Sequence, residues 1–137
     1  ISVFGGKQLR PNLHIQDYCD VVKVFLSAPA EKIKNQIFNV GYQNMSINEI
    51  ALVVKKVVQE EFKDFGEIKI TTEKSDDIRS YHINSSKIEK ILGFKPKRKV
   101  ESAVRDLCIS FKSKIFNNTF ENDFYFNVKR LKNIKAL

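Results

Sequence analysis

The clearest pattern of polar and apolar positions runs from residue 10 to residue 26. Its first half, RPNLH, is polar, and its second half brings apolar side chains to one helical face at Tyr18, Val21, Val22, Phe25 and Leu26. This spacing predicts a helix that has Asp17 as its N-cap and is stopped by Pro29. A rigid helix directly behind a polar cluster can hold a binding group in place, although the same polar residues also fit an ordinary loop.

A second helical pattern follows Ser46. The sequence SINE predicts a capping box, with Ser46 at the cap and Glu49 reaching back to it. Gly66 is expected to end this helix. Its buried stripe is expected at Ile47, Ile50, Ala51, Val54, Val57, Val58 and Phe62.

Shorter runs predict the other elements. Strands are expected at residues 1–4, 36–40 and 67–72, with a polar connection at 31–35. A third helix is expected after Asn84 or Ser85, ended by Gly93, and a fourth from about Val100 to Phe111. Together these elements predict an α/β fold of about four helices, with short strands in one or two small sheets.

Two stretches do not fit a core element. Residues 73–83, EKSDDIRSYHI, are too polar to be buried. Residues 112–137 are rich in Phe, Asn and Lys, and Phe124, Phe126 and Val128 alternate with other residues. We expect this second stretch to form a basic, Phe-rich tail.

Composition indicates a globular chain with no membrane span. The 137 residues suit one domain, with 42% hydrophobic and 29% charged residues. No apolar run approaches the ~18 residues of a membrane helix, and there is no signal-peptide pattern. Cys19 and Cys108 lie within helical patterns, so we expect buried free thiols in a reducing, cytoplasmic compartment. Because Ile1 lies within a strand-like run, we expect a fragment that lacks its upstream part.

The net charge of +8 makes polyanions attractive partners in general, including nucleic acid, anionic lipid and phosphorylated metabolites. However, the sequence has no RNP pattern, zinc-finger spacing or basic helix followed by heptads. A solvated lysine-rich surface is the default interpretation. We expect neither a membrane nor a nucleic acid as partner.

The candidate chemistry is cationic. We predict no glycine-rich phosphate loop, no YxxxK pair, no metal site and no catalytic residue in this chain. Arg10, Lys74 and Arg79 each lie in a polar break between elements. Because arginine binds phosphate oxygens as a fork, two such breaks could form a diphosphate clamp. Alternatively, Arg79 pairs with Asp76 or Asp77, and Lys74 is solvated.

Four segments occur in an order and spacing that resemble a known family. They are VFGGKQLRPNLHIQD, IFNVG, SINEIA and DDIRSYHINSSKIEKILGFKPK. They resemble the C-terminal, substrate-binding subdomain of extended short-chain dehydrogenases/reductases, specifically the NAD-dependent epimerase/dehydratase family that acts on nucleotide sugars. The resemblance covers residues 1–111, which we expect to form the nucleotide-sugar-binding subdomain, and leaves out the tail.

The resemblance assigns substrate-binding roles to four residues. Arg10 matches the arginine that holds the nucleotide diphosphate, and Asn12 lies beside the nucleotide. Arg79 matches an arginine of the dehydratase-like branch, while Lys74 stands where epimerases often have a second diphosphate arginine. Because lysine lacks the fork, the choice between Lys74 and Arg79 as second phosphate ligand stays open. Asp17 matches an aspartate with a structural role.

The family's NAD-binding loop and catalytic YxxxK lie in its N-terminal Rossmann half, which we expect to be missing here. The resemblance therefore implies a chain that is not catalytic alone and needs no cofactor. In the intact enzyme, an isomerase or lyase of carbohydrate metabolism, NAD would oxidise a sugar hydroxyl. The expected partners are a nucleotide-diphosphate sugar and the Rossmann half.

Two further expectations follow. If a partner half is missing, an apolar patch should be exposed along Tyr18, Val22 and Phe25 or near Phe38.

The alternative function is a non-catalytic basic binding module built on an enzyme-derived half-domain, which the Phe-rich basic tail favours.

Overall fold

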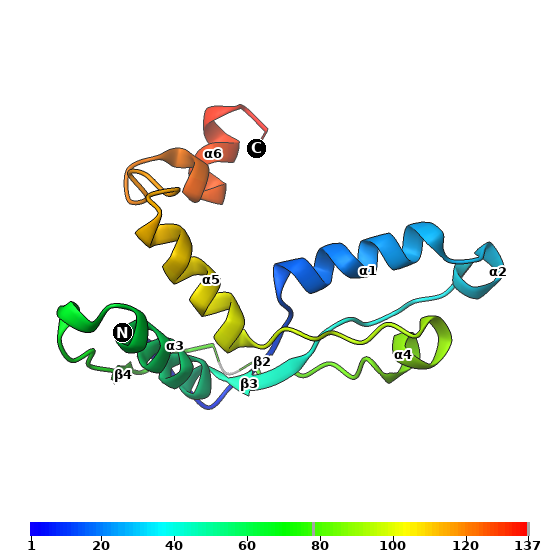
Figure 1. Ribbon diagram of the computed structural model, residues 1–137, viewed down its shortest axis with the longest axis horizontal. Helices are drawn as coiled ribbons and strands as arrows, with labels where there is room; N and C mark the ends of the chain where they lie inside the picture. Colours follow the sequence, from blue (N-terminus) through cyan, green and yellow to red (C-terminus); the bar gives the residue numbers. More distant parts are fainter. Residues whose placement is uncertain (78, 137) are drawn as a thin grey trace. The chain divides into compact units, whose positions relative to one another are not determined.

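The computed structural model describes residues 1–77 and 79–136 (Figure 1). It forms two compact units, one over Ile1–Arg105 and the other over the residues that follow. The described residues contain six α-helices and four short strands, which agrees with the predicted α/β class. None of these helices has the length and apolar character needed to cross a bilayer.

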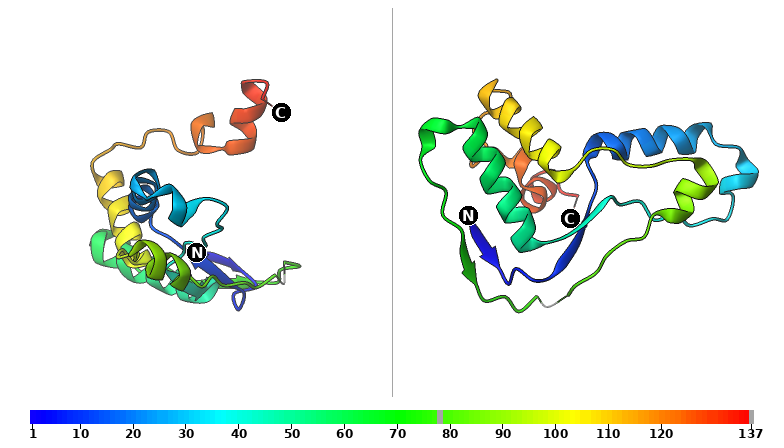
Figure 2. Two further views of the ribbon diagram at one scale, coloured as in Figure 1. Left: turned by 90° about the vertical axis from the view of Figure 1, so that its right-hand side faces the viewer. Right: turned by 60° about the horizontal axis from the view of Figure 1, so that its bottom comes forward.

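Two small sheets lie in the first unit. β1 (Ser2–Phe4) pairs in parallel with β4 (Thr71–Glu73), and the two lie side by side in Figure 2. β2 (Leu9–Asn12) pairs antiparallel with β3 (Gln43–Ser46). The turn between β1 and β2 requires glycine, because Gly6 has φ +104° and a Cβ there would lie 2.2 Å from Asn48 Oδ1.

The helix predicted after Ser46 is confirmed as α3 (Ile47–Glu61). Both halves of the capping box form, since Ser46 Oγ accepts from Glu49 N at 3.2 Å and Glu49 Oε2 accepts from Ser46 N at 2.7 Å. None of the seven predicted stripe residues is exposed, and Ala51 and Val57 are buried. Gly66 follows a short 3₁₀ turn, η1 (Lys63–Phe65), and therefore ends that turn and not α3 itself.

The predicted N-cap of the first helix is wrong. α1 (Ile15–Ser27) begins two residues before Asp17, and the His14 side chain is the cap, accepting from Gln16 N at 3.1 Å. Asp17 is only 1% exposed and binds a distant segment instead. Its carboxylate accepts from Lys97 N at 3.0 Å and Arg98 N at 2.8 Å, and it forms an ion pair with the Arg98 guanidinium.

The two faces of α1 differ in exposure. On one face Val21 packs with Ile88 and Phe94 in a small core, and Phe25 contacts Phe38 at 5.5 Å between ring centroids. The opposite face is exposed along its length, at Ile15, Tyr18, Cys19, Val22 and Leu26.

The expected apolar patch is thus confirmed at Tyr18 and Val22 but not at Phe25 and Phe38, which pack on the core. The expectation that both cysteines are buried holds for Cys108 and is wrong for Cys19.

Several element boundaries also differ from the prediction. Residues 36–40 form no strand; side chains hold this stretch, with Lys87 Nζ donating to the Ile37 carbonyl at 2.9 Å. The expected polar connection at 31–35 contains the short helix α2 (Ala30–Ile33), and the strand expected at 67–72 starts only at Thr71 as β4. A strand requires a partner for its backbone, which periodicity alone does not reveal.

The last elements of the chain are helical. α4 (Ser86–Leu92) ends at Gly93 in the left-handed conformation, as predicted, and α5 (Val100–Lys112) follows. In the second unit, η2 (Asp123–Tyr125) and α6 (Asn127–Asn133) occupy the stretch where apolar residues alternate. Whether residues 1–111 and 112–137 are functionally distinct stays a prediction.

The buried carboxylate of Asp17 generates a stability prediction. Asp17→Ala should lower the free energy of unfolding by about 3 kcal/mol, because it leaves two amides without an acceptor and the Arg98 guanidinium with only its more exposed partner, Asp20. Urea denaturation followed by circular dichroism measures this loss. The control is Asp20→Ala, which removes a more exposed partner of the same guanidinium and should cost less. Equal losses would contradict the structural role of Asp17.

Candidate functional site

Arg10 lies on a strand that is held along both edges. One edge of β2 pairs with β3, where Arg10 is opposite Met45. Along the other edge, Leu9 N donates to Ser80 Oγ at 2.9 Å, and Tyr81 N donates to the Leu9 carbonyl at 3.4 Å. These bonds bring the polar stretch around residue 80 to Arg10, although about 70 residues separate them in sequence.

The Arg10 guanidinium is fixed by several contacts. Its Nη1 donates to the carbonyls of Leu9 at 2.9 Å and Arg79 at 2.6 Å. Its Nη2 donates to Asp77 Oδ2 at 3.2 Å, and the group lies 5.2 Å from the centroid of the Tyr81 ring. Because the side chain is only 22% exposed, this guanidinium is a preorganised donor and not a freely moving charge.

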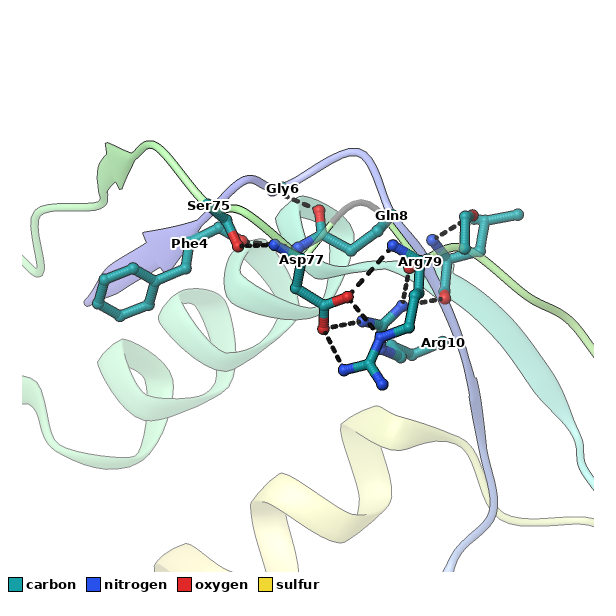
Figure 3. Close-up of polar contacts among 9 residues, drawn as sticks. Phe4, Gly6, Gln8, Arg10, Ser75, Asp77 and Arg79 are labelled. Carbon is teal, nitrogen blue, oxygen red and sulfur yellow. Dashed lines mark hydrogen bonds and ion pairs between the residues drawn. The ribbon is translucent and has the colours of Figure 1, made fainter.

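Asp77 is the anion at the centre of the site (Figure 3). Its Oδ1 accepts from Arg79 N at 3.2 Å and Arg79 Nε at 2.7 Å, while its Oδ2 accepts from Arg79 Nη2 at 3.0 Å and from Arg10. The hydrogen bonds from Arg79, helped by the charge of Arg10, lower the pKa of Asp77 to about 2. Two guanidiniums thus converge on one carboxylate, and their N–H groups are donors of the kind that bind oxyanions.

The structure brings together two of the four predicted substrate-binding residues. Arg10 and Arg79 share Asp77, whereas Lys74 is exposed and forms no ion pair with a residue that the structure describes. Asn12 Nδ2 donates to the Arg10 carbonyl at 2.8 Å and to the Gln43 carbonyl at 3.2 Å. Substrate binding by all four residues stays a prediction.

Asn12 also lines a separate small cavity. This cavity has a volume of about 140 Å³, and its wall includes the buried His14 and the guanidinium-bearing Arg98. A larger surface hollow of about 380 Å³ opens beside Asp77, with Lys7, Gln8 and Ser75 in its wall. The hollow is large enough for part of a small ligand beside Asp77, the carboxylate that pairs with both arginines, although neither arginine lines it.

Two residues of the cluster were missed by the sequence analysis as site residues. Asp77 was considered only as one of two possible partners of Arg79, and the structure selects it over Asp76. The spacing Asp-x-Arg was the available signal, since a side chain can bond to a backbone N–H two residues later. Nothing in the sequence indicated that Tyr81 would lie against Arg10.

The expectation that no YxxxK pair occurs is wrong as a statement about spacing, because Tyr125 and Lys129 are four residues apart. The pair is not helical, since Phe126 between them has φ −125° and ψ 94°. Lys129 Nζ donates to the Glu121 carbonyl at 3.2 Å. Residues four apart share a face only within a helix, so this pair lacks the arrangement that a catalytic YxxxK needs.

The described residues offer no metal site, since they contain no group of three or more His, Cys, Asp or Glu that could hold an ion. At the site itself, the guanidiniums of Arg10 and Arg79 offer charge-assisted hydrogen bonds.

The lowered pKa of Asp77 predicts a specific pH dependence. The ion pairs stabilise the fold above the ordinary value of 3.8, and this contribution is lost as the pH falls through about 2. The side-chain carboxyl ¹³C signal of Asp77 should accordingly titrate near pH 2 and move toward 3.8 in Arg79→Ala. An unchanged titration in that variant would show that Arg79 does not hold the carboxylate.

Comparisons with known proteins find similarity in structure. No family model matches the chain, and no curated protein matches it by sequence. Among solved structures, the ADP-L-glycero-D-manno-heptose-6-epimerase of Helicobacter pylori is 24% identical with a TM-score of 0.62. The match covers 82% of this chain and 33% of the epimerase chain. The UDP-glucose 4-epimerase of Thermotoga maritima is 19% identical with a TM-score of 0.63, and the match covers 85% of this chain and 36% of the epimerase chain.

A third similar structure is the L-threonine dehydrogenase of Clostridium difficile, with 19% identity, a TM-score of 0.62, and shares of 80% and 35%. The chain thus spans about a third of the length of the structures it matches. The resemblance found in the sequence is confirmed at the level of fold: about four-fifths of this chain folds like part of an extended short-chain dehydrogenase/reductase.

Proposed function

We propose that this chain is the nucleotide-diphosphate-sugar-binding part of an NAD-dependent sugar epimerase or dehydratase, and that it is not catalytic alone. The observation that carries the proposal is the convergence of the Arg10 and Arg79 guanidiniums on one carboxylate. A diphosphate offers two phosphate groups to these two guanidiniums, and charge-assisted hydrogen bonds between arginine and phosphate are strong and directional.

The choice of a nucleotide sugar rests on the site and not on the fold. Two of the similar structures are named for nucleotide-linked sugars, ADP-heptose and UDP-glucose, but the third is named for L-threonine. An amino acid presents one carboxylate, which a single guanidinium fork can bind. Because the Arg79 fork and Nη2 of Arg10 both reach the site, and Lys7 adds positive charge at the neighbouring hollow, the site favours the diphosphate.

The NAD-binding half of the enzyme is the proposed second partner. It would cover the exposed apolar face of α1, where Tyr18 is 56% exposed and Val22 and Leu26 lie beside it on the helix surface. This other half of the enzyme would bind NAD and would supply the catalytic tyrosine. An isomerase or lyase of the cytoplasm is the resulting assignment for the full-length protein.

One observation supports the alternative of a non-catalytic basic binding module. The second unit exposes large aromatic side chains, with Phe120 at 92% and Phe124 at 68% exposure, and the Arg130 guanidinium lies 4.2 Å from the centroid of the Phe124 ring. Binding of a polyanion that depends on these phenylalanines and not on Arg10 would favour that module over the nucleotide-sugar site.

Arg10→Ala tests the clamp directly. In the full-length protein it should weaken nucleotide-diphosphate-sugar binding by about 1.5–3 kcal/mol, the usual effect of losing a charge-assisted hydrogen bond, and leave NAD binding nearly unchanged. Calorimetry measures both affinities. The charge-matched control is Lys90→Ala on α4, and a parallel comparison of Lys74→Ala with Arg79→Ala identifies the second phosphate ligand. An unaltered nucleotide-sugar affinity in Arg10→Ala would contradict the clamp.

The chain by itself should have no epimerase, dehydratase or reductase activity, even with NAD. Hydride transfer requires NAD and the sugar carbon to be held together, and a general base must take the hydroxyl proton. Binding of a nucleotide sugar should be millimolar at best, or about −4 kcal/mol. The test follows NADH absorbance and product mass with UDP-, dTDP-, GDP- and CDP-sugars. Turnover that persists in purified protein and disappears in Tyr125→Phe would place the chemistry in this chain.

A further inference from the structure

We propose that Asp77 is an internal competitor of the anion that this site binds, so that its carboxylate occupies Arg10 and Arg79 until a diphosphate replaces it. This role rests on the proposed function, since it concerns the same two arginines. It makes Asp77 the residue that sets the affinity of the site for phosphate groups.

The Asp77 carboxylate uses the same donors that a phosphate would use. It accepts four hydrogen bonds, three from Arg79 and one from Arg10, at 2.7–3.2 Å. A carboxylate has about four lone-pair positions, so its accepting capacity is filled. The side-chain N–H groups directed at it belong to the two guanidiniums, so a phosphate that binds these same N–H groups must replace the carboxylate.

Arg10 does not depend on Asp77 for its position. Its Nη1 is bound by two backbone carbonyls, and its guanidinium lies against Tyr81. If the carboxylate moves away, Nη2 of Arg10 therefore stays directed at the same place. The Arg79 side chain is 80% exposed and can follow the incoming anion.

A diphosphate and the Asp77 carboxylate cannot share this place without repulsion. Like charges within hydrogen-bonding range of the same donors disfavour each other, and the carboxylate stays ionised at neutral pH because its pKa is about 2. Its side chain is 35% exposed, so it can turn toward water. Between β4 and α4 the described residues form no helix or strand that would prevent this movement.

The test is a titration of the isotope-labelled chain with inorganic pyrophosphate. The side-chain Nε–H NMR signals of Arg10 and Arg79 monitor binding. Asp77→Asn should bind pyrophosphate about tenfold more tightly than the unmodified chain, because the ion pairs that compete with the ligand are lost. The matched control is Asp76→Asn, which makes the same charge change at an exposed neighbour that pairs with no described residue. Its affinity should stay within about twofold of the unmodified chain.

Equal or weaker binding by Asp77→Asn would overturn the proposal, since Asp77 would then orient the arginines and not compete for them. If the unmodified chain binds pyrophosphate and Asp77→Asn binds it equally well or more weakly, the competitor role fails and the proposed function stands. If no variant binds pyrophosphate at Arg10 and Arg79, both fail.

A second measurement needs no variant. On saturation of the unmodified chain with pyrophosphate, the carboxyl ¹³C signal of Asp77 should move to the position of a solvated carboxylate. An unmoved signal at saturation would show that the carboxylate keeps its arginine contacts, and this would overturn the proposal.

Discussion

The attachment of β2 along both of its edges is the constraint on which the candidate site depends. β3 fixes one edge, and Ser80 and Tyr81 fix the other through the backbone of Leu9. Because Arg10 follows Leu9 directly, these bonds determine that its guanidinium meets Asp77 and Arg79. Two polar segments that are far apart in the sequence thereby become one cationic cluster around a single carboxylate.

The features that the sequence could predict are those with local causes. Ser46 and Glu49 stand three residues apart and cap their own helix, and Gly93 ends α4 by adopting a conformation that few other residues tolerate. The apolar stripe of α3 also followed from helical spacing, whereas the exposure of Tyr18 and Val22 was expected because the resemblance implies a missing partner half. In the site, Arg10 and Arg79 were named as candidates because they are fork-shaped cations in polar breaks, while the choice between Lys74 and Arg79 was left open.

The features that could not be predicted depend on distant partners. Asp17 has the residue type of a cap, but a buried carboxylate is most stable where it meets several donors, and residues 97 and 98 supply them from far along the chain. Residues 36–40 have strand-like composition, yet no described backbone pairs with them to form a ladder. For the same reason the sequence could name Asp77 only as one of two alternatives for Arg79.

A structure of the chain with bound UDP-glucose tests most directly whether Arg10 and Arg79 together bind the diphosphate of a nucleotide sugar. We expect phosphate oxygens within hydrogen-bonding distance of Arg10 Nη2 and of the Arg79 guanidinium, with the nucleotide extending along the hollow beside Asp77. A nucleotide sugar bound at another surface, with Arg10 and Arg79 both still on Asp77, would contradict this expectation.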